Sequence, residues 1–121
     1  MNRKPLITCL ALLSGAASLS ALAHDYPTVD RVLYVQDCMN GHPGPYYEMV
    51  NKCSCALDAL ARELSFDDYT SMMTVTRAMS IGGERGNTIR DTESLQVQAK
   101  RFRELQSKVQ TGCFLGPPTR Q

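Results

Sequence analysis

Cysteine spacing constrains this chain more than any other feature of its sequence. Cys53 and Cys55 lie two residues apart in the alanine- and leucine-rich stretch KCSCALDALA, residues 52–61. A pair with this spacing fits a metal clip, a redox pair or two separate crosslinks. Which of these three interpretations is favoured depends on the compartment in which the protein works, because disulfides persist mainly where the surroundings are oxidising.

The first 23 residues predict export. Arg3 and Lys4 supply a short positive start, and an apolar run rich in small residues follows them. Residues 21–23, Ala-Leu-Ala, match the small-x-small pattern of a signal-peptidase site, so we expect a signal peptide over residues 1–23 that is cleaved before His24. The run is short for a membrane anchor, since a span needs about 20 strongly apolar residues. The expected location is therefore the periplasm, with no membrane attachment after cleavage.

The predicted mature chain, residues 24–121, is one small domain. Loss of Arg3 and Lys4 leaves 11 of the 13 basic residues against 12 acidic ones, a net charge of −1. This balance gives no electrostatic reason to expect nucleic acid or an anionic membrane as a partner. With only three Phe and no Trp the core is thin, so a chain of this size benefits from covalent crosslinks.

The cysteines of the mature chain predict two disulfides. Loss of the signal peptide leaves Cys38, Cys53, Cys55 and Cys113, and an even number in a small exported chain is typical of disulfide bonds. Residues two apart on a helix point about 200° apart, so Cys53 and Cys55 are poorly placed to bond each other. We favour Cys38–Cys53 with Cys55–Cys113, because Cys38 and Cys53 lie at comparable distances from the turn between their helices. The swapped pairing stays open, since the sequence alone allows three pairings.

Helical signals predict an all-α domain of four helices that two disulfides crosslink. The expected helices cover about residues 28–40, 46–64, 66–81 and 92–111. Strand signals are scarce, which favours a small helical bundle. We expect this disulfide-linked domain over residues 24–116 and a flexible tail over residues 117–121.

Apolar periodicity and end signals place these helices. The apolar stripe of the first helix is Val29, Val32, Leu33, Gln36 and Met39. The apolar face of the second is Met49, Cys53, Leu57, Leu60 and Leu64. The stripe of the last is Leu95, Ala99, Phe102, Leu105 and Val109. Ser65 with Asp68 three residues on resembles a capping box for the third helix, and Gly112 is placed to cap the end of the last.

Metal and redox chemistry compete with the two disulfides. Cys53 and Cys55 as a metal clip would need free thiolates, which suit copper(I) or zinc, whereas export favours disulfides. A redox pair usually has the spacing Cys-x-x-Cys at the start of a helix, and this pair does not. After cleavage, the α-amine and imidazole of His24 could chelate one copper ion, with His42 completing the site, because such nitrogens suit Cu(II). A periplasmic copper or other metal carrier is therefore the alternative function.

Residues 82–91, GGERGNTIRD, predict an interaction loop between the third and the last helix. Glu84, Arg85, Arg90 and Asp91 carry both charge signs among glycines, and a charged loop on a rigid scaffold is a common place for function. The loop has no Gly-Lys-Ser/Thr for phosphate and no alternating oxygen ligands for calcium. We expect internal ion pairs to hold it and a protein partner to dock on it, and a solvated turn is the alternative.

No catalytic set appears in the sequence. Neither Gly-x-Ser-x-Gly nor His-Glu-x-x-His nor a cofactor fingerprint is present. The two histidines, one of them terminal in the mature chain, leave little for acid–base chemistry. We therefore expect a protein that is not an enzyme and that needs no cofactor.

Three segments carry a resemblance to other proteins: AHDYPTVDRVLYVQDCM (residues 23–39), YEMVNKCSCALDALA (47–61) and GGERGNTIRD (82–91). With them the chain resembles a group of small exported proteins of Gram-negative bacteria that accompany periplasmic quinoprotein alcohol dehydrogenases and their cytochromes c. The resemblance covers most of the mature chain and carries over no catalytic residue. It implies a periplasmic accessory role, with a quinoprotein dehydrogenase or a cytochrome c as partner.

Overall fold

The computed structural model describes residues 25–119, so the predicted signal peptide and His24 lie outside the described residues. Residues 25–119 contain five α-helices and no strand. They are α1 (Thr28–Gly41), α2 (Tyr46–Glu63), α3 (Phe66–Ala78), α4 (Glu84–Arg90) and α5 (Glu93–Gly112). The predicted all-α class is confirmed. The predicted number of helices is corrected from four to five, because α4 forms within the segment that we expected to be a loop.

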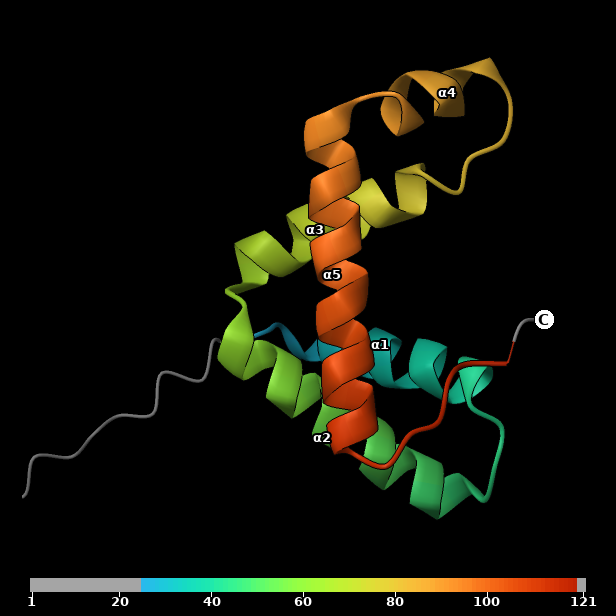
Figure 1. The fold of residues 1–121 in the computed structure, drawn as a ribbon. Coiled ribbons are helices and arrows are strands. Elements are labelled where there is room, and N and C mark those ends of the chain that lie inside the picture. The colour runs from blue at the N-terminus through green and yellow to red at the C-terminus, as the bar shows by residue number, and fades with distance from the viewer. Residues whose placement is uncertain (1–24, 120–121) are drawn as a thin grey trace, which may run out of the picture.

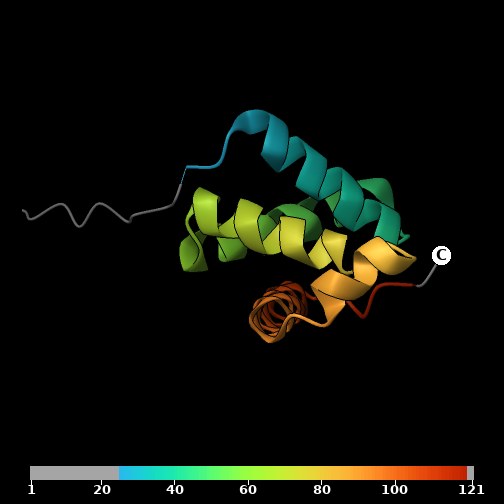
Figure 2. The same cartoon turned by 90° about the horizontal axis from the view of Figure 1, so that it is seen from above.

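The long helix α5 crosses the molecule, and the other helices are arranged around it (Figure 1). Both α2 and α3 pack against α5, and α1 packs against α2. Seen from above, with α5 end-on, α1 lies on the far side of α2 and α3, so the helices stack in three layers (Figure 2). α4 contacts α5 and lies at the end of the molecule away from α1 and α2 (Figure 1).

Two disulfides link these layers in the pairing that we favoured. Cys38 bonds Cys53 and ties α1 to α2, whereas Cys55 bonds Cys113 and ties α2 to the end of α5. Cys53 is fully buried and Cys55 is exposed, as expected for residues about 200° apart on one helix. Because α3 and α4 contain no cysteine, noncovalent contacts alone hold them to the domain.

The core consists mainly of the predicted faces of α2 and α5. All five residues of the predicted α2 face are buried: Met49, Cys53, Leu57, Leu60 and Leu64. On α5, Ala99, Phe102 and Val109 are buried and Leu105 packs against the core. Burying a side chain such as Leu60 or Phe102 contributes about 1.5–3 kcal/mol, so these two faces supply much of the stability of a small domain.

α1 turns a different face to the core from the one that its periodicity suggested. Its buried residues are Tyr34 and Cys38, whereas Val29, Val32 and Leu33 are 63 %, 49 % and 54 % exposed. The disulfide at Cys38 decides the orientation, because Tyr34 lies four residues earlier and so on the same side of the helix. Gln36 of the predicted stripe is exposed as well, so the stripe is wrong as a core face for four of its five residues, and only Met39 packs against the core.

The helix ends confirm one predicted cap and correct another. Ser65 caps α3, because its hydroxyl oxygen accepts a hydrogen bond from the Asp68 N–H at 3.1 Å. Gly112, expected to cap α5, is instead its last helical residue. The left-handed position falls on Phe114, with φ of 61°, and the Leu115 N–H reaches back across it to a carbonyl of the last turn of α5.

The chain after α5 runs back against the end of α1. The Thr119 N–H donates a hydrogen bond to the Gly41 carbonyl oxygen at 2.9 Å, and Leu115 is buried. These contacts tie residues 117–119 to α1, although the sequence led us to expect a loose tail there.

Candidate functional site

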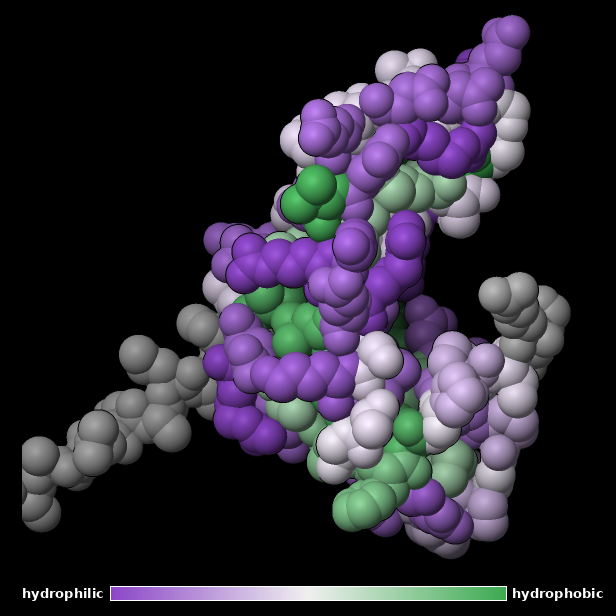
Figure 3. Space-filling view, viewed as in Figure 1, coloured by the Kyte–Doolittle hydropathy of each residue, from purple (hydrophilic) through white to green (hydrophobic). Residues whose placement is uncertain are grey.

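Residues 79–91, between α3 and α5, contain the segment for which we predicted an interaction loop. We call them the α4 arm. α3 ends at Ala78, three residues before its predicted end, and α4 begins at Glu84. The arm lies at one end of the molecule (Figure 1), and the surface that it presents in this view is mostly hydrophilic (Figure 3).

Two glycines give the α4 arm its shape. Gly83 precedes α4 with φ of 78°, a left-handed conformation that glycine adopts without steric cost. Gly86 is buried, and a Cβ atom there would lie 1.9 Å from the Ile81 carbonyl oxygen and 2.5 Å from Arg90 Nη1. The arm therefore closes on itself only because position 86 has no side chain.

Arg90 holds the α4 arm together from inside. Its Nη1 donates hydrogen bonds to the carbonyl oxygens of Ile81 at 2.6 Å and Met79 at 3.3 Å. Its Nη2 donates to the Gly83 carbonyl oxygen at 3.4 Å and to the side-chain oxygen of Asn87. Three of the four acceptors are carbonyl oxygens of the connection between α3 and α4. The Arg90 guanidinium is thus engaged within the arm.

The other three predicted interaction residues, Glu84, Arg85 and Asp91, are exposed. None of the ion pairs within residues 25–119 includes these three or Arg90. The prediction of internal ion pairs in this segment is therefore wrong, and the hydrogen bonds of Arg90 take their place. A protein partner can therefore contact two exposed carboxylates and one exposed guanidinium, which lie on α4 and directly after it.

His42 lies in the connection that follows α1 and is buried, with 7 % of its surface exposed. Its Nδ1 lies 2.8 Å from the Cys38 carbonyl oxygen and its Nε2 lies 2.9 Å from the Gly116 carbonyl oxygen. Carbonyl oxygens only accept hydrogen bonds, so a metal ion at either nitrogen would have to displace one of these contacts. The other predicted copper ligand, His24, lies outside the described residues, and the copper site stays a prediction.

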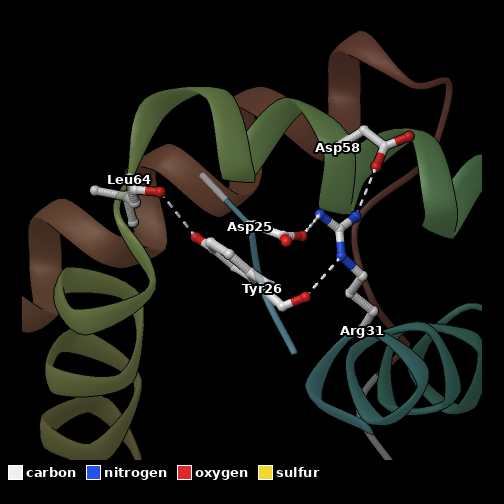
Figure 4. A network of polar contacts seen from close by, with 5 residues as sticks. All are labelled: Asp25, Tyr26, Arg31, Asp58 and Leu64. Carbon is white, nitrogen blue, oxygen red and sulfur yellow. Dashed lines mark hydrogen bonds and ion pairs between the residues drawn. The ribbon is translucent and has the colours of Figure 1, made fainter. Parts of the chain in front are cut away.

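Tyr26 fixes the segment before α1, and the sequence analysis did not single it out (Figure 4). Its O–H donates a hydrogen bond to the Leu64 carbonyl oxygen at 3.1 Å, and burial raises its pKa above the ordinary value. Arg31 donates from Nε to the Tyr26 carbonyl oxygen at 3.0 Å and pairs with Asp58 of α2 at 3.4 Å and, more loosely, with Asp25 at 3.8 Å. A tyrosine ahead of a helix belongs to no periodic pattern, so only the fold identifies it.

Three comparisons and two structural properties bear on the class of protein. Comparison with protein-family models, with curated proteins and with solved structures finds no match to this chain. Within residues 25–119, no three His, Cys, Asp or Glu side chains are grouped so that they could hold a metal ion. None of the helices in that range combines the length and the apolarity that crossing a bilayer requires.

Proposed function

We propose that the mature protein is a non-enzymatic periplasmic interaction module that docks a protein partner through the α4 arm. The observation that carries this proposal is that Arg90 shapes the arm from inside while Glu84, Arg85 and Asp91 face the solvent. A partner then meets charges that are already positioned, which reduces the entropy cost of binding. Charges presented in this way set the orientation and the association rate more than the affinity.

The partner class comes from the resemblance of the chain to small exported proteins of Gram-negative bacteria. It points to a periplasmic quinoprotein alcohol dehydrogenase or to a cytochrome c. The exposed residues of the arm carry both charge signs, so they favour a partner surface on which basic and acidic groups also alternate. The module then assists an alcohol oxidation system without carrying out chemistry of its own.

The test compares two arginine variants of the mature protein. Arg85→Ala removes a charge from the arm, and Arg101→Ala removes the same charge from the exposed face of α5. We expect Arg85→Ala to slow association with the purified dehydrogenase or cytochrome c severalfold, as measured by surface plasmon resonance. The difference from wild type should be larger at about 10 mM salt than at about 150 mM, because the Debye length falls from about 30 Å to about 8 Å.

Arg101→Ala is the matched control and should bind as wild type does. Circular dichroism should show the same helix content for all three proteins, because neither arginine has a side-chain partner within the arm or the core. If Arg85→Ala binds both partner proteins with wild-type kinetics at both salt concentrations, docking through the α4 arm is refuted.

A further inference from the structure

An open groove of about 710 Å³ runs between α1 and α2. We call it the α1/α2 groove. Its apolar lining residues are Val32, Val35 and Met39 of α1 and Tyr46, Val50 and Leu57 of α2. Val32 and Tyr46 are 49 % and 67 % exposed, so a partner can reach the apolar side chains on both walls of the groove.

The outward face of α1 extends the apolar surface of this groove. Val29 and Leu33 are 63 % and 54 % exposed and lie one helical turn apart, next to Val32 at the edge of the groove. The fold does not use this stripe for the core, because Tyr34 and Cys38 on the other side of α1 are the residues that it buries. Contiguous exposed apolar residues with a polar rim are typical of interaction sites.

The shape of the α1/α2 groove fits a third helix. Its lining on α1 runs from Arg31 to Asn40, which at 1.5 Å per residue is about 14 Å, or roughly two and a half turns. An amphipathic helix that binds in a groove uses anchors at i, i+3 or i+4, and i+7, which cover about this length. The Cys38–Cys53 disulfide joins the two walls, so the groove is preorganised for such a helix. A small molecule fits less well, because pockets for small molecules enclose most of the ligand.

Carboxylates dominate the end of the groove where α1 begins. Arg31 lies between Asp58, at 3.4 Å, and Asp25, at 3.8 Å (Figure 4). The carboxyl groups of Asp58 and Asp25 are 61 % and 100 % exposed, and each can accept further hydrogen bonds. One guanidinium against two carboxylates leaves a net charge of −1 at this end.

The other flank of the exposed stripe is acidic as well. Asp37 of α1 pairs with Arg77 of α3 at 3.0 Å, and Asp30 takes part in none of the ion pairs within residues 25–119. This flank therefore also carries a net charge of −1, and the rim as a whole carries −2. A basic partner is complementary to this rim, whereas a second copy of the chain would bring the same negative surplus against it.

We propose that the α1/α2 groove and the exposed stripe of α1 bind an amphipathic helix of a partner protein, in which lysine or arginine residues flank the apolar face. The apolar anchors of this helix pack against Val32, Val35 and Met39, and the flexible thioether of Met39 adapts to their shape. The flanking cations meet the carboxylates of the rim. No residue of the α4 arm lines the groove, so this proposal is independent of docking through the arm.

The test is a titration of isotope-labelled mature protein with two synthetic peptides, followed by amide chemical shifts. The first is a leucine–lysine peptide of about 14 residues, roughly four helical turns, with leucine at the anchor spacing. The second has the same leucines and glutamate in place of every lysine. We expect the leucine–lysine peptide to saturate shifts in α1 and α2 and to bind at least roughly tenfold tighter than the leucine–glutamate peptide at about 10 mM salt. This preference should shrink at about 150 mM salt, because the rim is screened.

Two valine variants separate the apolar contact from the charge. Val32→Ser should weaken binding of the leucine–lysine peptide roughly fivefold, because it removes apolar area that the peptide would cover. Val97→Ser is the matched control, because Val97 lies on α5 outside the groove and is 61 % exposed. It should bind the peptide as wild type does, and circular dichroism should show the same helix content for both variants.

Four results would overturn the proposal. Shifts that do not saturate, or that map away from α1 and α2, exclude this groove. Equal affinity of the wild type for the two peptides excludes a basic partner, and this comparison needs no variant. Wild-type affinity in a folded Val32→Ser protein excludes the apolar contact. If sedimentation shows that the wild type is a dimer and Val32→Ser a monomer, a second copy of the chain is the occupant instead.

Discussion

Replacing Gly86 with alanine tests how the α4 arm is built. A Cβ atom at position 86 would lie 1.9 Å from the Ile81 carbonyl oxygen, whereas real Cβ contacts essentially never fall below 3.0 Å. The arm must therefore open by about 1 Å at this point. The same carbonyl oxygen accepts a hydrogen bond from Arg90 at 2.6 Å, so opening the arm also disturbs that hydrogen bond.

The size of the expected effect follows from the steric strain at position 86 and from the weakened hydrogen bond of Arg90. Forcing extra volume into a packed site costs about 1–3 kcal/mol. A hydrogen bond from a charged donor is worth about 1.5–3 kcal/mol, and less here because Arg90 is partly exposed. We expect Gly86→Ala to lower the free energy of opening the arm by about 2 kcal/mol, which corresponds to a roughly thirtyfold loss of amide protection at 1.4 kcal/mol per tenfold.

Hydrogen exchange measured by mass spectrometry on peptides that cover α4 is the assay. Gly82→Ala is the matched control, because nothing lies within 4 Å of a Cβ atom at that position. The effect should stay local, since α5 is the helix against which α4 packs, so peptides from α1 and α2 should keep wild-type protection. If α4 exchanges at the wild-type rate in Gly86→Ala, the close packing inside the arm is refuted.

Three further perturbations test the rest of the domain. Cys55→Ser combined with Cys113→Ser should lower the free energy of unfolding by about 4 kcal/mol in urea melts, because this disulfide closes 58 residues; a loss below 1 kcal/mol would contradict the chain-entropy reasoning. Burial raises the pKa of Tyr34 from 10.0 to about 12, so between these pH values the folded state keeps a proton that the unfolded chain releases. The free energy of unfolding should therefore be unaffected by this group below pH 10 and should fall between pH 10 and 12, and Tyr34→Phe should make that fall smaller. Tyr26→Phe removes the donor to the Leu64 carbonyl oxygen and should cost about 1 kcal/mol, or about 4–8 °C in melting temperature, whereas the same change at an exposed tyrosine should leave the melting temperature unaltered.

Local signals predicted the parts of the fold that depend on one helix at a time. The apolar face of α2 was predictable because its leucines and Cys53 recur at the helical period. The favoured disulfide pairing followed from the angle between Cys53 and Cys55 on that helix, together with an antiparallel α1–α2 pair. In each case the information lies within one helix or one short connection.

The features of the fold that depend on contacts between distant residues were predicted wrongly or not at all. The periodicity of α1 is real, but Val29, Val32 and Leu33 lie outward because the disulfide of Cys38 fixes the other side toward α2. Tyr34 could have been identified from its place four residues before that cysteine. The helix of the α4 arm was not predictable, because seven residues are too few for a periodic signal and its closing contact joins Arg90 to carbonyl groups nine to eleven residues earlier.

The disulfides divide the domain into a crosslinked part and a part without crosslinks, which meet where α3 and α4 pack on α5. α1, α2 and α5 are linked covalently, whereas α3 and the α4 arm are held by packing, hydrogen bonds and one ion pair. That ion pair, between Asp37 of α1 and Arg77 of α3, is exposed and contributes about 0–1 kcal/mol, so packing against α5 sets the position of α3. The carbonyl oxygen of Met79, directly after the last residue of α3, accepts a hydrogen bond from Arg90, and α3 and α4 both pack on α5. α3 and the α4 arm are therefore coupled to each other through Arg90 and to the crosslinked helices through α5, so a substitution that loosens the arm should reach α3 before it reaches α1 and α2.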